Sequence, residues 1–180
     1  MPGSDPGFTV WLTGLSGAGK STLGALVGEE LGRRGRVVER LDGDVVREWL
    51  SKGLGFSKED RDTNVARIGW VASRLTRAGA AVVVSAISPY AELRTHVRGL
   101  VEEHGGFVEV YVAASVEECA RRDPKGLYAK AYRGEIADFT GVSAPYEAPE
   151  DPEVRVDTEV QEPAESAAFI VRRLEQLGLL

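Results

Sequence analysis

Apolar residues in this chain gather in five short runs, which predict five strands. The runs FTVWLT (8–13), RVVERL (36–41), AAVVVSA (80–86) and FVEVYVA (107–113) suit buried strands, and VRV (154–156) predicts a short last one. The run at 80–86 is apolar almost throughout, which is typical of a parallel sheet that is covered on both faces.

Between these runs, apolar residues recur at helical spacing. The expected helices lie, in chain order, at about 20–35, 57–79 and 90–103, from Ser115 onward, and at 163–177. Ser57 with Asp60, and Ser115 with Glu118, resemble capping boxes that begin two of these helices. Strands that alternate with helices predict an α/β fold, a doubly wound parallel sheet with helices on both faces.

The length of 180 residues suits a single domain, 1–180. Residues 1–6 lack the basic and apolar regions of a signal peptide, and we expect a disordered leader there. Residues 123–152 are rich in glycine, proline and charge and have weak periodicity. Such a segment is typical of a mobile functional lid or of a disordered linker, and it marks a candidate substrate loop.

Charge and cysteine content narrow the class of protein. A net charge of −6 argues against a general nucleic-acid binder, so an anionic ligand must be held by local positive charge. No apolar run is long enough to span a membrane, and we expect no membrane partner. The single cysteine, Cys119, excludes an internal disulfide, is expected to pack as a small hydrophobe, and fits a cytoplasmic location.

The stretch GLSGAGKST lies between the first expected strand and the first expected helix. Gly14, Gly19, Lys20 and Ser21 fit the pattern G-x-x-x-x-G-K-[ST] of a phosphate-binding loop. Glycines let backbone N–H groups converge on phosphate oxygens, and the helix adds its positive N-terminus. In such a loop the lysine reaches the β- and γ-phosphates and the serine hydroxyl ligates Mg²⁺. The alternative is a glycine-rich turn without chemical meaning, but the place between strand and helix favours a nucleoside triphosphate site.

Two aspartates follow the second expected strand, at the edge where doubly wound folds bind ligands. Asp42 and Asp44 can divide labour, one holding Mg²⁺ through water and the other accepting a hydroxyl proton. The run at 80–86 ends without the acidic residue that often holds the metal there, so Asp42 is the expected magnesium partner, with Ser21. The alternative is an acidic turn with Asp44 as the N-cap of the next helix.

Three arginines and an aromatic residue predict a second, anionic substrate. Arg47 and Arg67 flank the stretch GLGFSKEDRDTN, which holds Phe56, Arg61 and Asn64. Arginine forks suit phosphate or sulfate, and a phenylalanine after glycine can stack on a base. The alternative is that these arginines lie on solvated helix faces and pair with neighbouring acidic residues.

Seven stretches, taken in order, resemble the adenylylsulfate kinase (APS kinase) family. They are GLSGAGKST, LDGD-x-x-R, LGFSKEDRDTN, ISPY, RDPKGLYAKA, GEIADFTG and APYEAPE, and they extend the resemblance from Gly7 to the C-terminal helix. The resemblance implies a P-loop kinase that transfers the γ-phosphoryl of ATP to the 3′-hydroxyl of adenosine 5′-phosphosulfate. The product would be 3′-phosphoadenosine 5′-phosphosulfate, the activated sulfate donor. It also implies Mg²⁺ as the metal and a homodimer.

The resemblance assigns residues to each substrate. For ATP it implies Gly14, Leu15, Ser16, Gly17, Ala18, Gly19, Lys20, Ser21 and Thr22, with Arg122 against the adenine. For the phosphosulfate nucleotide it implies Asp44, Arg47, Phe56, Arg61, Asn64, Ile87, Ser88, Lys125 and Phe139. Val45, Ala86 and Ala91 depart from the family pattern, but they leave the phosphate loop, the aspartates and these arginines intact.

The expected catalytic residues are Lys20, Asp42, Asp44 and Ser88. Lys20 would neutralise charge on the transferred phosphoryl, and Asp44 would accept the proton of the 3′-hydroxyl. Phe56 and Phe139 would sandwich the acceptor adenine, and Arg47 and Arg61 would grip its phosphosulfate.

Two of these residues leave alternatives open. Ser88 matches a serine that serves bacterial members of the family as a phosphorylated intermediate, but direct in-line transfer needs none. We therefore expect a binding role first, with covalent catalysis or a helix N-cap before Pro89 as alternatives. Lys125 is expected to bring charge when the lid closes, or else to be an exposed lysine without a role.

Two other functions compete with this interpretation. One is another small-molecule kinase of the shikimate or gluconate type, which shares the loop and an aspartate pair. The other is a sensing module that binds a nucleotide without turnover. Asp44 beside Lys20 argues against the sensor, and Phe56 with the stretch DFTG argues against a sugar-sized substrate.

Overall fold

The computed structural model describes residues 6–180. Within them, five strands form one sheet in the order β2-β3-β1-β4-β5, and every neighbouring pair is parallel. The central strand β1 (Phe8–Thr13) lies between β3 (Ala81–Ser85) and β4 (Gly106–Ala113). The edges are β2 (Val38–Asp42) and β5 (Val154–Asp157). Of the leader expected at 1–6, residues 1–5 lie outside the described part of the chain, and Pro6 is exposed.

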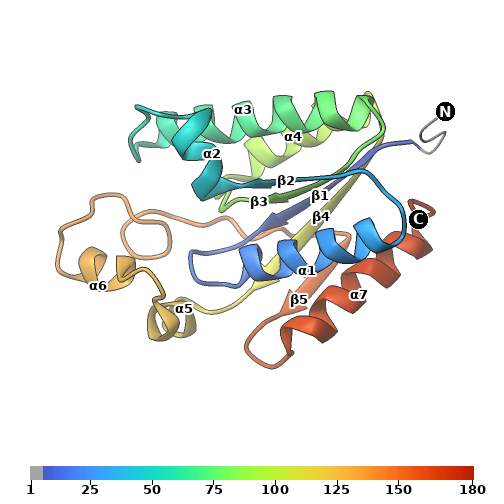
Figure 1. The fold of residues 1–180 in the computed structure, drawn as a ribbon. Coiled ribbons are helices and arrows are strands. Elements are labelled where there is room, and N and C mark those ends of the chain that lie inside the picture. The colour runs from blue at the N-terminus through green and yellow to red at the C-terminus, as the bar shows by residue number, and fades with distance from the viewer. Residues whose placement is uncertain (1–5) are drawn as a thin grey trace.

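Helices cover both faces of the sheet, which confirms the doubly wound α/β fold (Figure 1). The helices α1 (Lys20–Arg33) and α7 (Pro163–Gln176) lie on one face. On the other face lie α3 (Lys58–Arg77) and α4 (Ala91–Glu102). The strands β2 and β3 lie on one side of β1, and β4 and β5 lie on the other. The strand order therefore reverses beside β1, and the carboxyl end of β1 lies at the switch point where such folds bind ligands.

The core follows the two-residue period of the strands. Phe8, Val10 and Leu12 of β1 belong to the apolar cluster under α1 and α7, whereas Trp11 belongs to the cluster under α3 and α4. All six residues of β1 are buried. The central strand is therefore covered on both faces, as expected of a buried strand in a parallel sheet.

Three short segments differ from the sequence-based expectation. The edge strand β2 starts at Val38, two residues later than expected, and includes Asp42. The helix α6 (Leu127–Tyr132) was not expected, and the helix α2 (Gly43–Trp49) was considered only in the alternative for Asp44, because six and seven residues are too few for a recognisable helical period. With α5 (Val116–Arg122), α6 lies beyond the carboxyl ends of the strands (Figure 1). Between residues 6 and 180 no helix combines the length and the apolar character needed to cross a membrane.

Candidate active site

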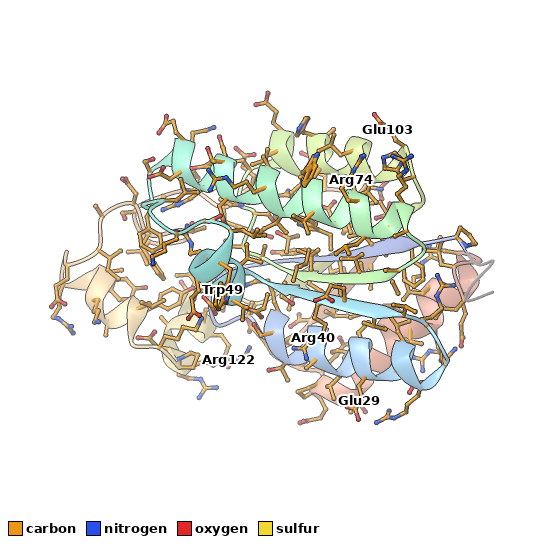
Figure 2. All side chains as sticks on the ribbon, turned by 45° about the horizontal axis from the view of Figure 1, so that its top comes forward. Glu29, Arg40, Trp49, Arg74, Glu103 and Arg122 are labelled. Atoms are coloured by element: carbon orange, nitrogen blue, oxygen red, sulfur yellow. The ribbon has the colours of Figure 1, made fainter. Side chains whose placement is uncertain are left out.

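A cavity of about 1050 Å³ opens at the carboxyl ends of the strands. Its walls come from the loop after β1, the turn into α2, the first half of α3, the residues after β3, the segment 122–140 and the turn after β5. Figure 2 shows Trp49 of α2 and Arg122 of α5 toward this end of the molecule, and Glu103 at the opposite end. The cavity therefore lies at the switch point of the sheet.

The predicted phosphate loop forms the floor of the cavity. The loop residues that line it are Ser16, Gly17, Gly19, Lys20, Ser21 and Thr22, whereas Gly14, Leu15 and Ala18 are not among the lining residues. Gly17 and Gly19 have φ of 79° and 104°, a region that side chains with a Cβ rarely adopt. Gly19 is the N-cap of α1 and offers no side-chain cap, so the first N–H groups of the helix stay available to an anion.

Lys20 folds back onto this loop. Its ammonium donates hydrogen bonds to Gly14 O at 2.9 Å and Leu15 O at 2.7 Å, and the residue is only 8% exposed. Burial lowers the pKa of Lys20 to about 8, because a charged ammonium is costly to remove from water. A buried ammonium at the floor of a cavity is suited to bind a phosphate. The charge of a phosphate would attract the ammonium more strongly than the two carbonyl dipoles do.

Ser21 and Asp42 bring two hard oxygen ligands together. The Ser21 hydroxyl donates to Asp42 Oδ2 at 2.5 Å, and Asp42 Oδ1 accepts a hydrogen bond from the Asp44 N–H at 3.0 Å. Asp42 is therefore the N-cap of α2, and the alternative that gave this role to Asp44 is wrong. In the β2–β3 register Asp42 pairs with Ser85, so β3 supplies no carboxylate at this position.

These two oxygens fit a magnesium site. The described residues contain no group of three or more histidine, cysteine, aspartate or glutamate side chains that could hold a metal by themselves. Mg²⁺ commonly takes one or two protein oxygens and completes its shell with substrate phosphates and water. A hydroxyl and a carboxylate beside a phosphate loop match that preference.

Asp44 forms an ion pair with Lys125, the lysine that precedes α6. Both side chains are at least half exposed. The pair joins the turn after β2 to the segment 123–152 across the mouth of the cavity, which both residues line. This segment is thus neither a structureless linker nor remote from the aspartates.

Of the three arginines expected to bind an anion, two line the cavity and one does not. Arg47 lies with its guanidinium 4.4 Å from the centre of the Phe56 ring, and Arg61, which is 8% exposed, donates to Thr140 Oγ1 at 3.0 Å. Both line the cavity, and in the described residues neither forms an ion pair with an acidic side chain. Burial, followed by the charge of Arg61, lowers the pKa of Arg47. Arg67 does not line the cavity and donates to Leu50 O instead.

The remaining acceptor residues also line the cavity. Asn64 is 8% exposed, and its Oδ1 has no hydrogen-bond partner in the described structure. Phe139 meets the ring of Tyr128 edge-on at 4.9 Å, and Phe56 is 58% exposed. A buried amide oxygen without a partner is costly, so this position is suited to a donor group of a ligand.

Ile87 and Ser88 line the cavity from the loop after β3. Ser88 has φ of 40° and is 2% exposed, and its Oγ accepts a hydrogen bond from Trp11 Nε1 at 3.0 Å. The N-cap of α4 is Tyr90, so the alternative that made Ser88 a helix cap is wrong. Cys119 is buried in the apolar cluster under α1, as expected of a small hydrophobe, and burial raises its pKa.

The opposite wall of the cavity combines the predicted Arg122 with two residues, Thr158 and Gln161, that the sequence did not reveal as site residues. Arg122 donates to Thr158 O at 2.6 Å and to Glu118 Oε1 at 2.7 Å, and Thr158 Oγ1 in turn donates to Ala18 O at 2.8 Å. Thr158 and Gln161 line the cavity beside Arg122. Their position after the last strand, at the same carboxyl end of the sheet as the aspartates, was the one available signal.

Comparison with known proteins agrees with this site. The family model described as adenylylsulphate kinase matches residues 6–157. An adenylyl-sulfate kinase of Rippkaea orientalis is 54% identical over 174 residues, which cover 97% of this chain and 94% of the relative. A solved Mycobacterium tuberculosis APS kinase, in complex with AMPPNP and APS, is 43% identical with a TM-score of 0.91, and the match covers 95% of this chain and 99% of that one.

A second solved relative is a hexameric APS kinase from Thiobacillus denitrificans. It is 41% identical with a TM-score of 0.76, and the match covers 98% of this chain but 30% of that longer one. The family model, the relatives and the phosphate loop beside an arginine-lined cavity all point the same way. This chain belongs to the adenylylsulphate kinase family.

Proposed function

We propose that this protein transfers the γ-phosphoryl of ATP to the 3′-hydroxyl of adenosine 5′-phosphosulfate. One observation carries the proposal within the site. One cavity joins a phosphate loop to two arginines, Arg47 and Arg61, which form no ion pair with an acidic side chain among the described residues. Family membership supports the same reaction. The product, 3′-phosphoadenosine 5′-phosphosulfate, is the activated form of sulfate.

ATP binds with its phosphates on the loop Gly14–Thr22. The N–H groups at the start of α1 and the Lys20 ammonium bind the β- and γ-phosphates. The negative phosphates stabilise the charged form of Lys20, which burial disfavours. Arg122 and Thr158 lie on the β5 side of this loop and form the base end of the ATP site. The acceptor then occupies the other side, toward α2 and α3.

The acceptor is held by charge and by stacking. Arg47 and Arg61 bind the phosphosulfate, Asn64 offers its unpartnered oxygen, and Phe56 with Phe139 encloses the adenine. Asp44 accepts the proton of the 3′-hydroxyl as the oxygen attacks the γ-phosphorus. Lys125 leaves Asp44 when the acceptor binds and turns its charge to the acceptor.

Ser21 and Asp42 hold Mg²⁺ in this proposal, the carboxylate acting through water. The metal neutralises charge on the β- and γ-phosphates when it is bound. Asp42 also caps α2, and so fixes the helix that presents Asp44 to the cavity.

Ser88 takes a supporting role rather than a covalent one. Its hydroxyl accepts from Trp11 and lies 3.0 Å from Thr13 Oγ1, to which it donates, in a place that is 2% exposed. An attacking oxygen needs access to the γ-phosphorus and a base to accept its proton. Direct transfer to the acceptor meets both needs through Asp44 and is the mechanism that we favour.

We further propose that the protein self-associates, as a homodimer, and that it works in the cytoplasm. The hexameric state of a relative supports self-association, and a buried free thiol at Cys119 suits a reducing compartment. Light scattering on the purified protein tests the first proposal.

The reaction is tested by following ADP release from ATP with a panel of acceptors. We expect turnover with adenosine 5′-phosphosulfate and none with shikimate, with gluconate or with the 3′-deoxy nucleotide. Turnover of shikimate or gluconate, with no turnover of adenosine 5′-phosphosulfate, would show a small-molecule kinase with a different acceptor. Binding of ATP without turnover of any acceptor would favour the sensing module.

A further inference from the structure

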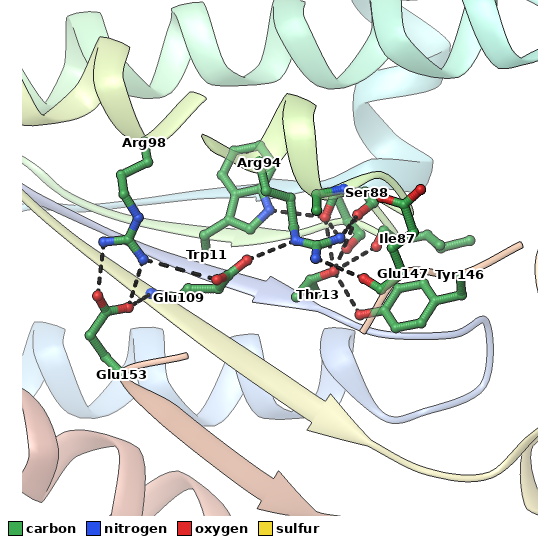
Figure 3. A network of polar contacts seen from close by, with 12 residues as sticks. Trp11, Thr13, Ile87, Ser88, Arg94, Arg98, Glu109, Tyr146, Glu147 and Glu153 are labelled. Atoms are coloured by element: carbon green, nitrogen blue, oxygen red, sulfur yellow. Dashed lines mark hydrogen bonds and ion pairs between the residues drawn. The ribbon is translucent and has the colours of Figure 1, made fainter. Parts of the chain in front are cut away.

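One buried arginine joins three separate parts of the chain (Figure 3). Arg94 of α4 donates from Nε to Glu109 Oε1 at 2.8 Å, from Nη1 to Ser88 O at 2.8 Å and from Nη2 to Glu147 O at 2.7 Å. Its side chain is 4% exposed. Glu109 belongs to β4, Ser88 follows β3, and Glu147 lies near the end of the segment 123–152. Because a guanidinium is a rigid planar fork, these three groups are held in a fixed relation.

A row of hydroxyl groups makes a second connection between the same segments (Figure 3). Trp11 Nε1 donates to Ser88 Oγ, Ser88 Oγ donates to Thr13 Oγ1 at 3.0 Å, and Thr13 Oγ1 donates to Ile87 O at 2.7 Å. The Tyr146 hydroxyl lies 3.0 Å from Thr13 Oγ1. Since the Thr13 proton is used toward Ile87, Tyr146 donates to Thr13. The Ser88 hydroxyl also lies 3.3 Å from Ala86 O, a second acceptor for its proton. The row therefore links Trp11 and Thr13 of β1 to the loop after β3 and to Tyr146.

The loop that these bonds hold is strained and forms part of the cavity wall. Ser88 has a φ of 40°, which a residue with a Cβ keeps only where its surroundings hold it. The Glu147 N–H donates to Pro89 O at 2.8 Å, and Glu147 Oε2 accepts from the Ala91 N–H at 2.7 Å. Glu147 thus bonds directly to the chain after Ser88, at Pro89 and Ala91. Its link to Ser88 runs through Arg94, and the link from Tyr146 to Ile87 runs through Thr13.

The order of the strands in the sheet puts the loop 87–89 on the acceptor side of the cavity. The strand β3 lies between β1 and β2, on the side of the phosphate loop where Asp42 and Asp44 lie. The residues that line the base end of the ATP site, Thr158 and Gln161, follow β5 on the opposite side. A displacement of Ile87 and Ser88 therefore changes the acceptor side of the cavity and leaves the ATP side in place.

We propose that Arg94 is a positioning residue for the acceptor substrate. By holding Ser88 O and Glu147 O together, it fixes the loop 87–89 to the returning end of the segment 123–152, so that acceptor affinity depends on an arginine that does not itself line the cavity. This proposal rests on the proposed function, because it concerns the acceptor named there. The competing account is that Arg94 only neutralises the buried carboxylate of Glu109.

Arg98, on the same helix, separates the two accounts. It binds the Glu153 carboxylate at 2.8 Å and 2.9 Å and lies 4.0 Å from Glu109 Oε2. In the described part of the chain it makes no hydrogen bond or ion pair with the loop 87–89. Arg94→Lys keeps a positive charge beside Glu109 but cannot reproduce the planar fork to two carbonyl groups. Arg98→Lys makes the same change one helical turn away. The pair therefore differs in the contacts to Ser88 and Glu147.

The test measures KM for both substrates and the melting temperature of each variant. We expect Arg94→Lys to raise KM for adenosine 5′-phosphosulfate about tenfold with KM for ATP unchanged, because a small misplacement of a binding group has a large kinetic effect. Arg98→Lys should leave both KM values unchanged. Unchanged KM values in Arg94→Lys, an equal rise of both, or the same split in Arg98→Lys would overturn the proposal.

Tyr146→Phe decides the question if Arg94→Lys does not fold. It deletes a single hydroxyl from the row that reaches Thr13 and should raise KM for the acceptor by a smaller factor, again without an effect on ATP. Unchanged KM for the acceptor in this variant would then reject the positioning role. A wild-type protein that fails to phosphorylate the acceptor would instead reject the proposed function, so the two failures are distinct.

Discussion

Asp44 and Lys125 form an ion pair although 81 positions separate them in the chain. Asp44 lies in the first turn of α2, after the edge strand β2, and Lys125 lies in the segment that borders the mouth of the cavity. An exposed pair of this kind contributes little to stability. We propose a functional role for the pair. It holds the Lys125 ammonium beside Asp44, the proposed general base, until the acceptor binds.

Replacing Lys125 with methionine should lower kcat/KM for adenosine 5′-phosphosulfate by about tenfold or more, since a charge-assisted contact to the acceptor is lost. The free energy of unfolding should stay within about 0.5 kcal/mol of wild type, because the side chain is half exposed. Lys130→Met is the matched control, an exposed lysine of the neighbouring helix α6. Equal loss of activity in both variants would contradict a specific role for Lys125.

The two aspartates should fail in different ways. Asp44→Asn should lower kcat by at least about 100-fold, because a general base contributes that much, while calorimetry shows a smaller effect on acceptor binding. Asp42→Asn keeps the N-cap of α2, since asparagine caps helices as well as aspartate, but it weakens the metal site. It should therefore raise the Mg²⁺ concentration needed for half-maximal rate. If Asp44→Asn kept its kcat but needed more Mg²⁺, the assignments would be reversed. Asp44 would then hold the metal, and Asp42 would be the general base.

The sequence predicted the strands and the phosphate loop because both are local. A buried strand of a parallel sheet needs a continuous apolar run, and the loop needs its glycines and Lys20 within nine residues. The network around Arg94 could not be predicted in this way. Its bond to Glu147 spans 53 positions and ends on a main-chain carbonyl, which leaves no trace in side-chain patterns. Arg67 looked equivalent to Arg61, and only the direction of each side chain from α3 separates them.

Lys20 makes stability and nucleotide binding respond to pH in opposite directions. Its pKa of about 8 in the folded protein lies below its ordinary value of 10.5, so between these values the unfolded chain binds more protons and stability rises with pH. Below pH 8 the buried charge costs about 3 kcal/mol. Affinity for a non-hydrolysable ATP analogue should instead fall above pH 8, as the ammonium loses its proton.

Lys20→Met tests both halves of this argument. It removes the charge at similar volume, so the free energy of unfolding at pH 7 should rise by about 1–2 kcal/mol, the full gain being reduced by the lost bonds to Gly14 and Leu15. The pH dependence of stability between 8 and 10.5 should flatten, and transfer should be abolished. Urea unfolding at several pH values, with ADP release beside it, makes the measurement. Wild-type turnover would show that the loop does not serve the γ-phosphate.

The last prediction concerns how the acceptor is chosen. Arg47→Met and Arg61→Met should each raise KM for adenosine 5′-phosphosulfate and leave KM for ATP nearly unchanged, because both arginines line the α2–α3 side of the cavity, away from the phosphate loop. A charge-assisted hydrogen bond contributes on the order of 1.5–3 kcal/mol, which corresponds to a rise of about tenfold or more.

Variants at Phe56 and Arg67 complete this test of acceptor binding. Phe56→Ala should act in the same direction as the arginine variants through lost stacking, and it also removes the ring over which Arg47 lies at 4.4 Å. Arg67→Met is the matched control, because Arg67 comes from the same helix as Arg61 but bonds to Leu50 O outside the cavity. Steady-state kinetics with each substrate varied in turn make the comparison. If Arg67→Met raised KM for the acceptor as much as Arg61→Met, general positive charge would account for the affinity, and the anion site would have to be sought elsewhere.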